Sequence, residues 1–259
     1  MKKHWEGNFL YYFGGIILSL FLCAGLIHMI SEGSGTEHQT SVDHVQKTEQ
    51  DAAQKEQKQK SGEQQTVIRV LLKTDGYADE VHPNVSVLAK GGLVLEGKNR
   101  KQEATEGETV TIAPDDPLFE GGSVWVKPAK EGDPITISSL NRGYGTPSYR
   151  GKLELFSTAQ GIAVVNELPL EEYLYAVVPS EMPASYEEEA LKAQAVCARS
   201  YACCHMEGQA YPEYRANVDD STAYQVYGNS AEQEKTIAAV DSTRGEKLTY
   251  NGNVVKAYY

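Results

Sequence analysis

The 259-residue sequence is poor in basic residues, and this shortage excludes one class of function. It contains 24 Lys and Arg against 36 Asp and Glu, a formal net charge of −12. Residues 66–259 hold 18 of the basic and 28 of the acidic residues, a net charge of −10. A protein that binds nucleic acid presents a basic stripe that displaces counterions from phosphates. We therefore expect no nucleic-acid partner, and a polyanionic ligand would have to be recognised by a local cluster of cations.

Cysteine is scarce as well, which limits disulfides and metal sites. Cys23 lies in an apolar N-terminal segment, so three cysteines remain, Cys197, Cys203 and Cys204. An odd number cannot pair internally, and adjacent cysteines are rarely bridged. Cys203, Cys204 and His205 could chelate a metal only if a helix unwound there, so packing of small sulfur side chains is the better interpretation. We predict no metal and no cofactor.

Several catalytic motifs are also missing. The sequence has no Gly-rich phosphate loop, no H-E-x-x-H and no G-x-S-x-G. Only His82 and His205 lie in residues 66–259, so a histidine-based triad is hard to assemble. The chemistry that remains is that of carboxylates.

One long apolar run is present near the N-terminus. Residues 9–30 contain no Asp, Glu, Lys or Arg and would span roughly 33 Å as a helix, against about 30 Å of hydrocarbon. Lys2 and Lys3 precede it and Glu32 follows, which places the N-terminus in the cytoplasm. A cleavable signal peptide is the alternative, but the run is long for one and no clear A-x-A site follows. We predict a single-pass membrane anchor in residues 1–30, with the rest of the chain outside the cytoplasm.

The remaining chain predicts an α+β protein behind a linker. Residues 31–65 are rich in Gln, Glu, Lys and Ser, which predicts a disordered linker. Short β-type runs such as VIRVLL at 67–72 then alternate with Gly, Pro and Asp as far as about residue 167. We expect a β-rich module over 66–148 and a mixed α/β core over 149–259.

Local signals place two helices and a hairpin in that core. Ser185 and Glu188 form an S-x-x-E capping box that predicts a helix running to Gly208, and a second helix is predicted over 230–243. Asn251-Gly252 predicts a hairpin with a type I′ turn. The second strand of that hairpin is still running at Tyr259, so we expect the core to continue beyond it.

One carboxylate is set apart from the others. Glu181 lies in AVVPSEMPASY between Pro179 and Pro183, and its apolar neighbours would disfavour its charged form. A carboxylic acid of this kind can donate a proton to a leaving oxygen and take one back. The simpler interpretation is that Glu181 caps the helix that follows it.

Five motifs follow one another in the stretch from residue 149 to 259: YRG at 149–151, VVNELPLEEYLYAVVPSEMP at 164–183, EALKAQAVCARSYA at 189–202, VDDSTAYQVYG at 218–228 and VVKAYY at 254–259. On these motifs the stretch resembles the stage II sporulation protein D family (SpoIID/LytB domain). The resemblance implies a cell-wall protein of Gram-positive bacteria that is similar to lytic transglycosylases acting on peptide-free peptidoglycan strands. It also implies that Glu181 is the catalytic residue.

The resemblance extends to three further residues. Arg199 could be solvated beside Lys192, or it could reach a site carboxylate or the lactyl group of muramic acid, and the family motif favours the site. Gln225 and Tyr227 could hydrogen-bond and stack a sugar, although Tyr alternating with Val is also typical of a strand in a core.

In the implied reaction, Glu181 protonates the glycosidic oxygen between N-acetylmuramic acid and N-acetylglucosamine and then deprotonates the muramoyl 6-hydroxyl. A hydrolase would need a second carboxylate, for which Glu167, Glu171, Asp219 and Asp220 are available. Two alternatives remain: a non-catalytic wall-binding enhancer of an amidase, and an envelope adaptor. The partners implied are glycan strands, a cell-wall amidase and a membrane protein.

Overall fold

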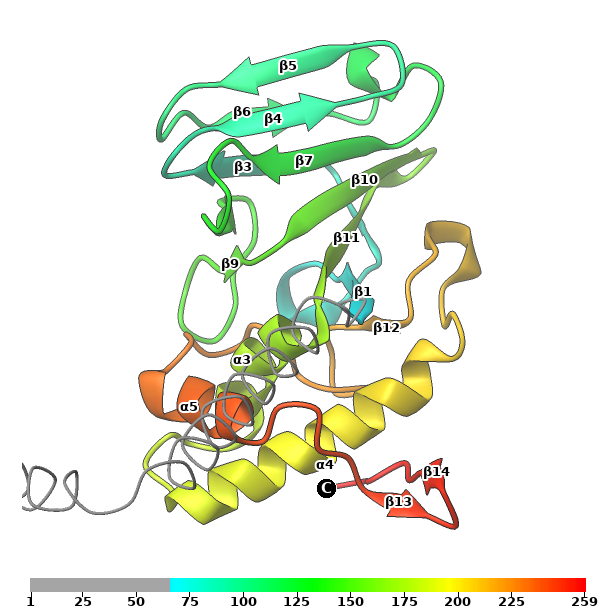
Figure 1. The fold of residues 1–259 in the computed structure, drawn as a ribbon. Helices are drawn as coiled ribbons and strands as arrows, with labels where there is room; N and C mark the ends of the chain where they lie inside the picture. The colour runs from blue at the N-terminus through cyan, green and yellow to red at the C-terminus, as the bar shows by residue number, and fades with distance from the viewer. Residues whose placement is uncertain (1–65) are drawn as a thin grey trace, which may run out of the picture. The chain divides into compact units, whose positions relative to one another are not determined.

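An eight-stranded sheet runs through residues 66–259, the part of the chain that the computed structural model describes (Figure 1). Its main path has the order β12-β1-β11-β10-β7-β4-β5, and β2 also pairs with β11. All pairs are antiparallel except β1 with β12. The strands are β1 (Val67–Leu72), β2 (Val81–His82), β4 (Leu93–Glu96), β5 (Lys101–Ala104), β7 (Val124–Pro128), β10 (Lys152–Thr158), β11 (Gly161–Pro169) and β12 (Val218–Asp219).

A four-stranded sheet, in the order β6-β3-β8-β9, shares its core with the larger sheet. It consists of β3 (Val85–Ala89), β6 (Val110–Ile112), β8 (Ile135–Ile137) and β9 (Ser148–Tyr149). Alternate residues point inward, as in β3, where Val85, Val87 and Ala89 are buried. The predicted β-rich region is therefore confirmed, because each expected apolar run forms a strand.

Three helices pack against one another beside the sheet: α3 (Leu170–Glu181), α4 (Glu188–Met206) and α5 (Glu234–Ser242) (Figure 1). The α+β class is confirmed, but the predicted S-x-x-E capping box is wrong. The N-cap of α4 is Glu187 and that of α5 is Gln233, and neither makes a side-chain cap bond. Ser230, where the second helix was predicted to begin, lies in the loop before α5, and its N–H donates to Ser180 Oγ at 3.1 Å.

The predicted hairpin is confirmed as β13 (Thr249–Tyr250) and β14 (Asn253–Val254). Asn251 and Gly252 have φ of +50° and +80°, the left-handed pair that a type I′ turn requires. In Figure 1 the hairpin lies beside the C-terminal half of α4.

The larger sheet takes strands from both sides of the predicted boundary at residue 148. β1 pairs with β11 along its whole length, from Val67 opposite Pro169 to Leu72 opposite Val164. The division into 66–148 and 149–259 stays a prediction, but strands from both parts contribute to the same buried core. The predicted anchor (1–30) and linker (31–65) lie outside the described residues. Within 66–259, none of the helices combines the length and the apolar character needed to span a bilayer.

Candidate functional site

Glu181 is the last residue of α3. Pro179 lies inside α3, and the helix ends at Met182, which is extended (φ −135°, ψ 125°) because Pro183 follows it. Val177 and Val178 are fully buried and anchor this last turn in the core. The Glu181 side chain is exposed, so the predicted apolar surroundings are absent, and it does not cap α4.

The last turn of α3 is tied to the loop that follows Gln225. The Val226 N–H donates to Glu181 Oε1 at 2.8 Å, and the N–H groups of Asn229 and Ser230 donate to Ser180 Oγ at 3.0 and 3.1 Å. The helix C-terminus is a place where the helix dipole does not favour a carboxylate, and the Val226 amide offsets this. The bond orients Glu181 and leaves its second oxygen without a hydrogen-bond donor among the described residues.

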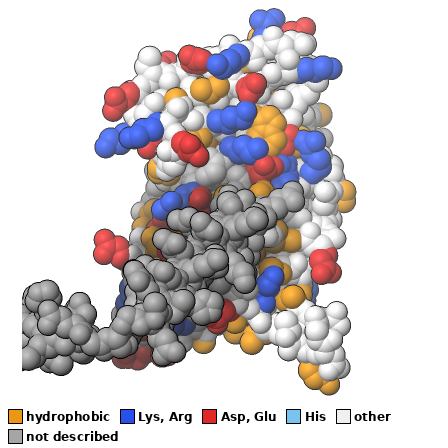
Figure 2. Space-filling view, in the orientation of Figure 1, with side chains coloured by type: hydrophobic (Ala, Val, Ile, Leu, Met, Phe, Trp, Pro, Cys, Tyr) orange, Lys and Arg blue, Asp and Glu red, His pale blue; other side chains and the backbone are white. Residues whose placement is uncertain are grey.

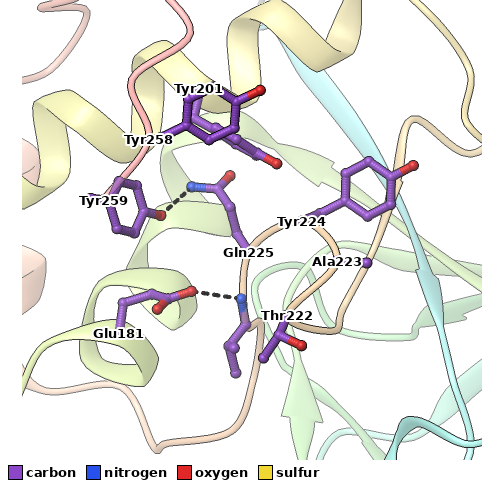
Figure 3. Close-up of a pocket in the computed structure, with 9 residues that line it drawn as sticks. Glu181, Tyr201, Thr222, Ala223, Tyr224, Gln225, Tyr258 and Tyr259 are labelled. Carbon is purple, nitrogen blue, oxygen red and sulfur yellow. Dashed lines mark hydrogen bonds between the residues drawn. The ribbon is translucent and has the colours of Figure 1, made fainter.

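Glu181 lines a cavity of about 330 Å³ that is walled mostly by tyrosines (Figure 3). In Figure 3 the rings of Tyr201 and Tyr258 lie on the other side of Gln225 from Glu181. The walls come from α3, α4, the 222–226 loop and the 258–259 segment, with the residues Glu181, Tyr201, Thr222, Ala223, Tyr224, Gln225, Val226, Tyr258 and Tyr259. One carboxylate among aromatic rings and amides is a suitable composition for binding and protonating a sugar.

The aromatic wall is stacked around a histidine. The His205 ring centroid lies 4.4 Å from that of Tyr201 and 5.2 Å from that of Tyr224, and Tyr258 meets Tyr201 edge-on at 5.9 Å. Burial, together with the nearby Lys256, lowers the pKa of His205, so the ring is neutral at pH 7. None of these tyrosines was predicted as a site residue. The signal present in the sequence is that Tyr is concentrated in the C-terminal part of the chain.

Gln225 lines the cavity, but its side-chain amide is already hydrogen-bonded within the protein. Its Nε2 donates to the Tyr259 hydroxyl at 2.6 Å and to the Ala198 carbonyl at 3.2 Å, and its Oε1 accepts from the Tyr173 hydroxyl at 3.3 Å. Gln225 is 1% exposed. It therefore fixes the floor of the cavity and holds Tyr259 in place, and burial raises the pKa of that hydroxyl.

The sequence left two roles open for Tyr227, stacking a sugar or packing in the core, and the structure places it in the core. Tyr227 is 1% exposed, its hydroxyl donates to Asn166 Oδ1 at 2.7 Å, and its ring lies 4.8 Å from that of Tyr173 and 5.4 Å from that of Tyr149. It does not line the cavity. The alternation of Tyr and Val marked a core position, which was the simpler interpretation.

Arg199 does not line the cavity either. The sequence left open whether it is solvated, meets a site carboxylate or meets the lactyl group of muramic acid, and the structure shows it buried against a carboxylate. It is 1% exposed and pairs with Glu171 through two bonds, Nε to Oε1 at 2.8 Å and Nη2 to Oε2 at 2.7 Å. It also donates to the carbonyl oxygens of Val240 and Glu246, both at 3.1 Å, and these bonds join α4 to α3, to the end of α5 and to the segment after it. Glu171 lies outside the cavity, so a contact of Arg199 with the substrate stays a prediction.

The other candidate carboxylates are committed elsewhere. Asp219 accepts from the Tyr211 hydroxyl at 2.6 Å, and Asp220 forms a buried pair with Arg142 at 2.5 Å. Burial raises the pKa of Asp220 to about 6, against the opposing attraction of Arg142. Glu167 and Glu171 are both in ion pairs. Among residues 66–259, Glu181 is the only carboxylate that lines this cavity.

The cysteines of α4 are unpaired in the described residues. Cys203 packs against the core, which raises the pKa of its thiol, and the Cys204 thiol donates to the Val254 carbonyl at 3.6 Å. Within residues 66–259, no group of three side chains could hold a metal ion. The contacts agree with the packing interpretation of the sulfur side chains.

Comparisons with known proteins show which family and which proteins this chain is similar to. Residues 158–250 match the SpoIID family, described as stage II sporulation protein. The chain is 39% identical over 109 residues to stage II sporulation protein D of Bacillus subtilis, and the alignment covers 37% of this chain and 32% of that protein. It is 43% identical over 86 residues to an amidase enhancer of the same organism, an alignment that covers 33% of this chain and 11% of the enhancer. It is 40% identical over 112 residues to an uncharacterised Brachyspira hyodysenteriae protein, and this alignment covers 43% of this chain and 30% of that protein.

This chain therefore spans between 11% and 32% of the length of these relatives. The matched segment includes Glu181 and most of α3, α4 and α5. The motifs from residue 149 onward, the family match over the helical core and the identity to stage II sporulation protein D lead to one conclusion: this chain carries a segment, residues 158–250, that is similar to the SpoIID family.

Proposed function

We propose that this protein acts on the bacterial cell wall as a lytic transglycosylase that cleaves glycan strands of peptidoglycan whose peptides have been removed. The observation that carries the proposal is a single exposed carboxylate, Glu181, in a cavity lined by tyrosines. The names of the relatives, a stage II sporulation protein D and an amidase enhancer, support a role in the cell wall during sporulation.

The proposed reaction needs one carboxylate and no water. Glu181 in its neutral form protonates the glycosidic oxygen that leaves the anomeric carbon of N-acetylmuramic acid, and the bond between them breaks. The Glu181 carboxylate then takes the proton of the muramoyl 6-hydroxyl, whose oxygen closes on the anomeric carbon as a 1,6-anhydro ring. Glu181 is neutral again at the end. A hydrolase would need a second carboxylate nearby, and none lines this cavity.

The second candidate is a wall-binding enhancer that does not cut. It is favoured by the 43% identity over 86 residues to the amidase enhancer. Both functions would need the chain to be held at the membrane with its folded part outside the cytoplasm. We propose that residues 9–30 are this anchor, because of the charge distribution around that apolar run. An amidase and a membrane protein are the proposed partners in either case.

Product analysis distinguishes these functions. The full chain, in mild detergent, is incubated with peptide-free glycan strands, and the ends are analysed by mass spectrometry beside Glu181→Gln and a control, Glu187→Gln. Glu187 is an exposed carboxylate that lies outside the cavity. Anhydromuramoyl ends from the wild type and the control alone establish the transglycosylase. Reducing ends mean a hydrolase, and binding without cleavage supports the enhancer.

A further inference from the structure

We infer that the solvent face of β4, β7 and β10 is a second glycan-binding surface, which holds an acidic, peptide-free strand apart from the Glu181 cavity. We call it the Trp125 face, after Trp125 and the lysines around it, Lys98, Lys127 and Lys152. In Figure 1 these strands lie in the upper part of the molecule, away from α3 and α4. The identity of the polymer rests on the proposed function, whereas the existence of the surface does not.

Trp125 is the only tryptophan in residues 66–259, and it points outward from the sheet. Its neighbours along β7, Val124 and Val126, are fully buried, while Trp125 itself is partly exposed. Its cross-strand partners are Glu96 on β4 and Glu154 on β10, so no apolar side chain directly opposite covers it. An indole held in this way offers a flat apolar face, which is how proteins stack pyranose rings.

Cations lie around this indole. Lys152 Nζ lies 4.2 Å from the centroid of the Trp125 ring. The Lys152 side chain is 38% exposed and its partner Glu167 is 19% exposed, whereas Lys127 is 41% exposed and pairs with Glu96, which is 51% exposed. Figure 2 shows Lys and Arg side chains gathered around hydrophobic ones on this part of the surface. At Lys152 a ligand therefore meets the ammonium group before the carboxylate.

Two glycine-containing loops build a hollow of about 440 Å³ next to the indole. A Cβ on Gly97 would overlap the Leu118 carbonyl oxygen, so glycine is required where the two loops meet. The stem of Lys98 lies along Gly121, and Lys98 forms no ion pair within the described part of the chain. The hollow is lined by Glu96, Gly97, Lys98, Gly121, Gly122, Ser123, Trp125 and Lys127.

The charge pattern selects the kind of polymer. Glu96, which lines the hollow, and Glu103 and Glu120 are 51%, 68% and 64% exposed and would repel a densely charged polyphosphate. A glycan strand freed of its peptides carries a carboxylate only on each muramic acid and a sugar ring at every position. It can therefore place rings on Trp125 and single carboxylates on lysines. This is also the local cluster of cations that an acidic chain needs in order to bind a polyanion.

The test is a binding measurement on the full chain carrying Glu181→Gln, so that strands stay intact. Dissociation constants are measured by calorimetry for peptide-free glycan strands, for neutral chitohexaose and for a glycerol-phosphate teichoic acid. We expect Trp125→Ala to weaken strand binding at least fivefold and Lys98→Gln with Lys127→Gln to weaken it about threefold. The matched control is Lys192→Gln, a lysine on α4 that lies outside both hollows.

Three outcomes would overturn the inference. They are strand binding by Trp125→Ala within twofold of its parent, an equal loss of strand and chitohexaose binding in the double lysine variant, and a teichoic acid that binds more tightly than the strands. If Trp125→Ala does not fold, Trp125→Phe and the double lysine variant carry the test, because neither removes packing from the core. Strand binding that depends on Trp125 in a protein that makes no anhydro ends would keep this surface and reject the transglycosylase.

Discussion

The Glu181 cavity and the Trp125 face present two different ways of meeting a polysaccharide. The cavity is lined by groups whose hydrogen bonds are made within the protein, such as Gln225, which is bonded to Ala198, Tyr173 and Tyr259. The Trp125 face is an open surface of long, flexible cations. Fixed groups can hold a substrate in a reactive geometry, whereas flexible charges hold a polymer without setting its register. The difference is in keeping with the two proposals, chemistry in the cavity and retention of the strand on the face.

The largest effect is expected at Glu181. Glu181→Gln keeps the shape of the side chain and can still accept the Val226 N–H, but it cannot donate and retrieve a proton. We expect cleavage of glycan strands to fall at least about a thousandfold, since one group serves as both acid and base. The measurement is the rate of anhydro-end formation beside Glu187→Gln. A glutamine variant that retains a tenth of the rate would show that Glu181 is not the acid and base of the reaction.

Arg199 provides the next test, because the family motif and the structure give it different roles. Arg199→Met leaves Glu171 without its partner in a largely buried position, and we expect the free energy of unfolding to drop by about 3–5 kcal/mol. Arg244→Met, which breaks an exposed pair with Asp241, should cost at most about 1 kcal/mol. Denaturant titrations of both variants give these values. An unchanged stability with lost cleavage would return Arg199 to the substrate site.

The sequence predicted what depends on local pattern and missed what depends on burial. The strands and the type I′ turn at Asn251 were identified because alternation and turn chemistry act between near neighbours. The start of α4 was misplaced because Ser185 offers a plausible cap that the chain does not use. The positions of Arg199 and Tyr227 follow from contacts with residues tens of positions away, so no motif could separate a buried residue from a site residue.

Substitutions at two tyrosines, one in the cavity wall and one in the core, should affect binding and stability differently. Tyr258 is 77% exposed and lines the cavity, so Tyr258→Ala should weaken binding of a short peptide-free oligosaccharide about tenfold and leave the melting temperature nearly unchanged. Tyr227→Phe leaves the Asn166 oxygen without its donor, so it should cost about 1–2 kcal/mol of stability and leave binding unchanged. Calorimetry and thermal melts distinguish the pair. Reversed effects would mean that Tyr227 reaches the sugar.

The smallest expected effect concerns strand length, and it tests the comparison between the Glu181 cavity and the Trp125 face most directly. If the Trp125 face retains a strand that the cavity cuts, then a long strand gains from both regions and a tetrasaccharide only from the cavity. Trp125→Ala should therefore raise KM about fivefold for long strands, without changing kcat, and leave the kinetics on tetrasaccharides unchanged. The same loss on short and long substrates would instead mean that the substitution disturbs the cavity through the shared core.

Raising the salt concentration should weaken the length advantage of the wild type more than that of the Lys98→Gln, Lys127→Gln double variant, since the ammonium groups on this face are exposed to screening.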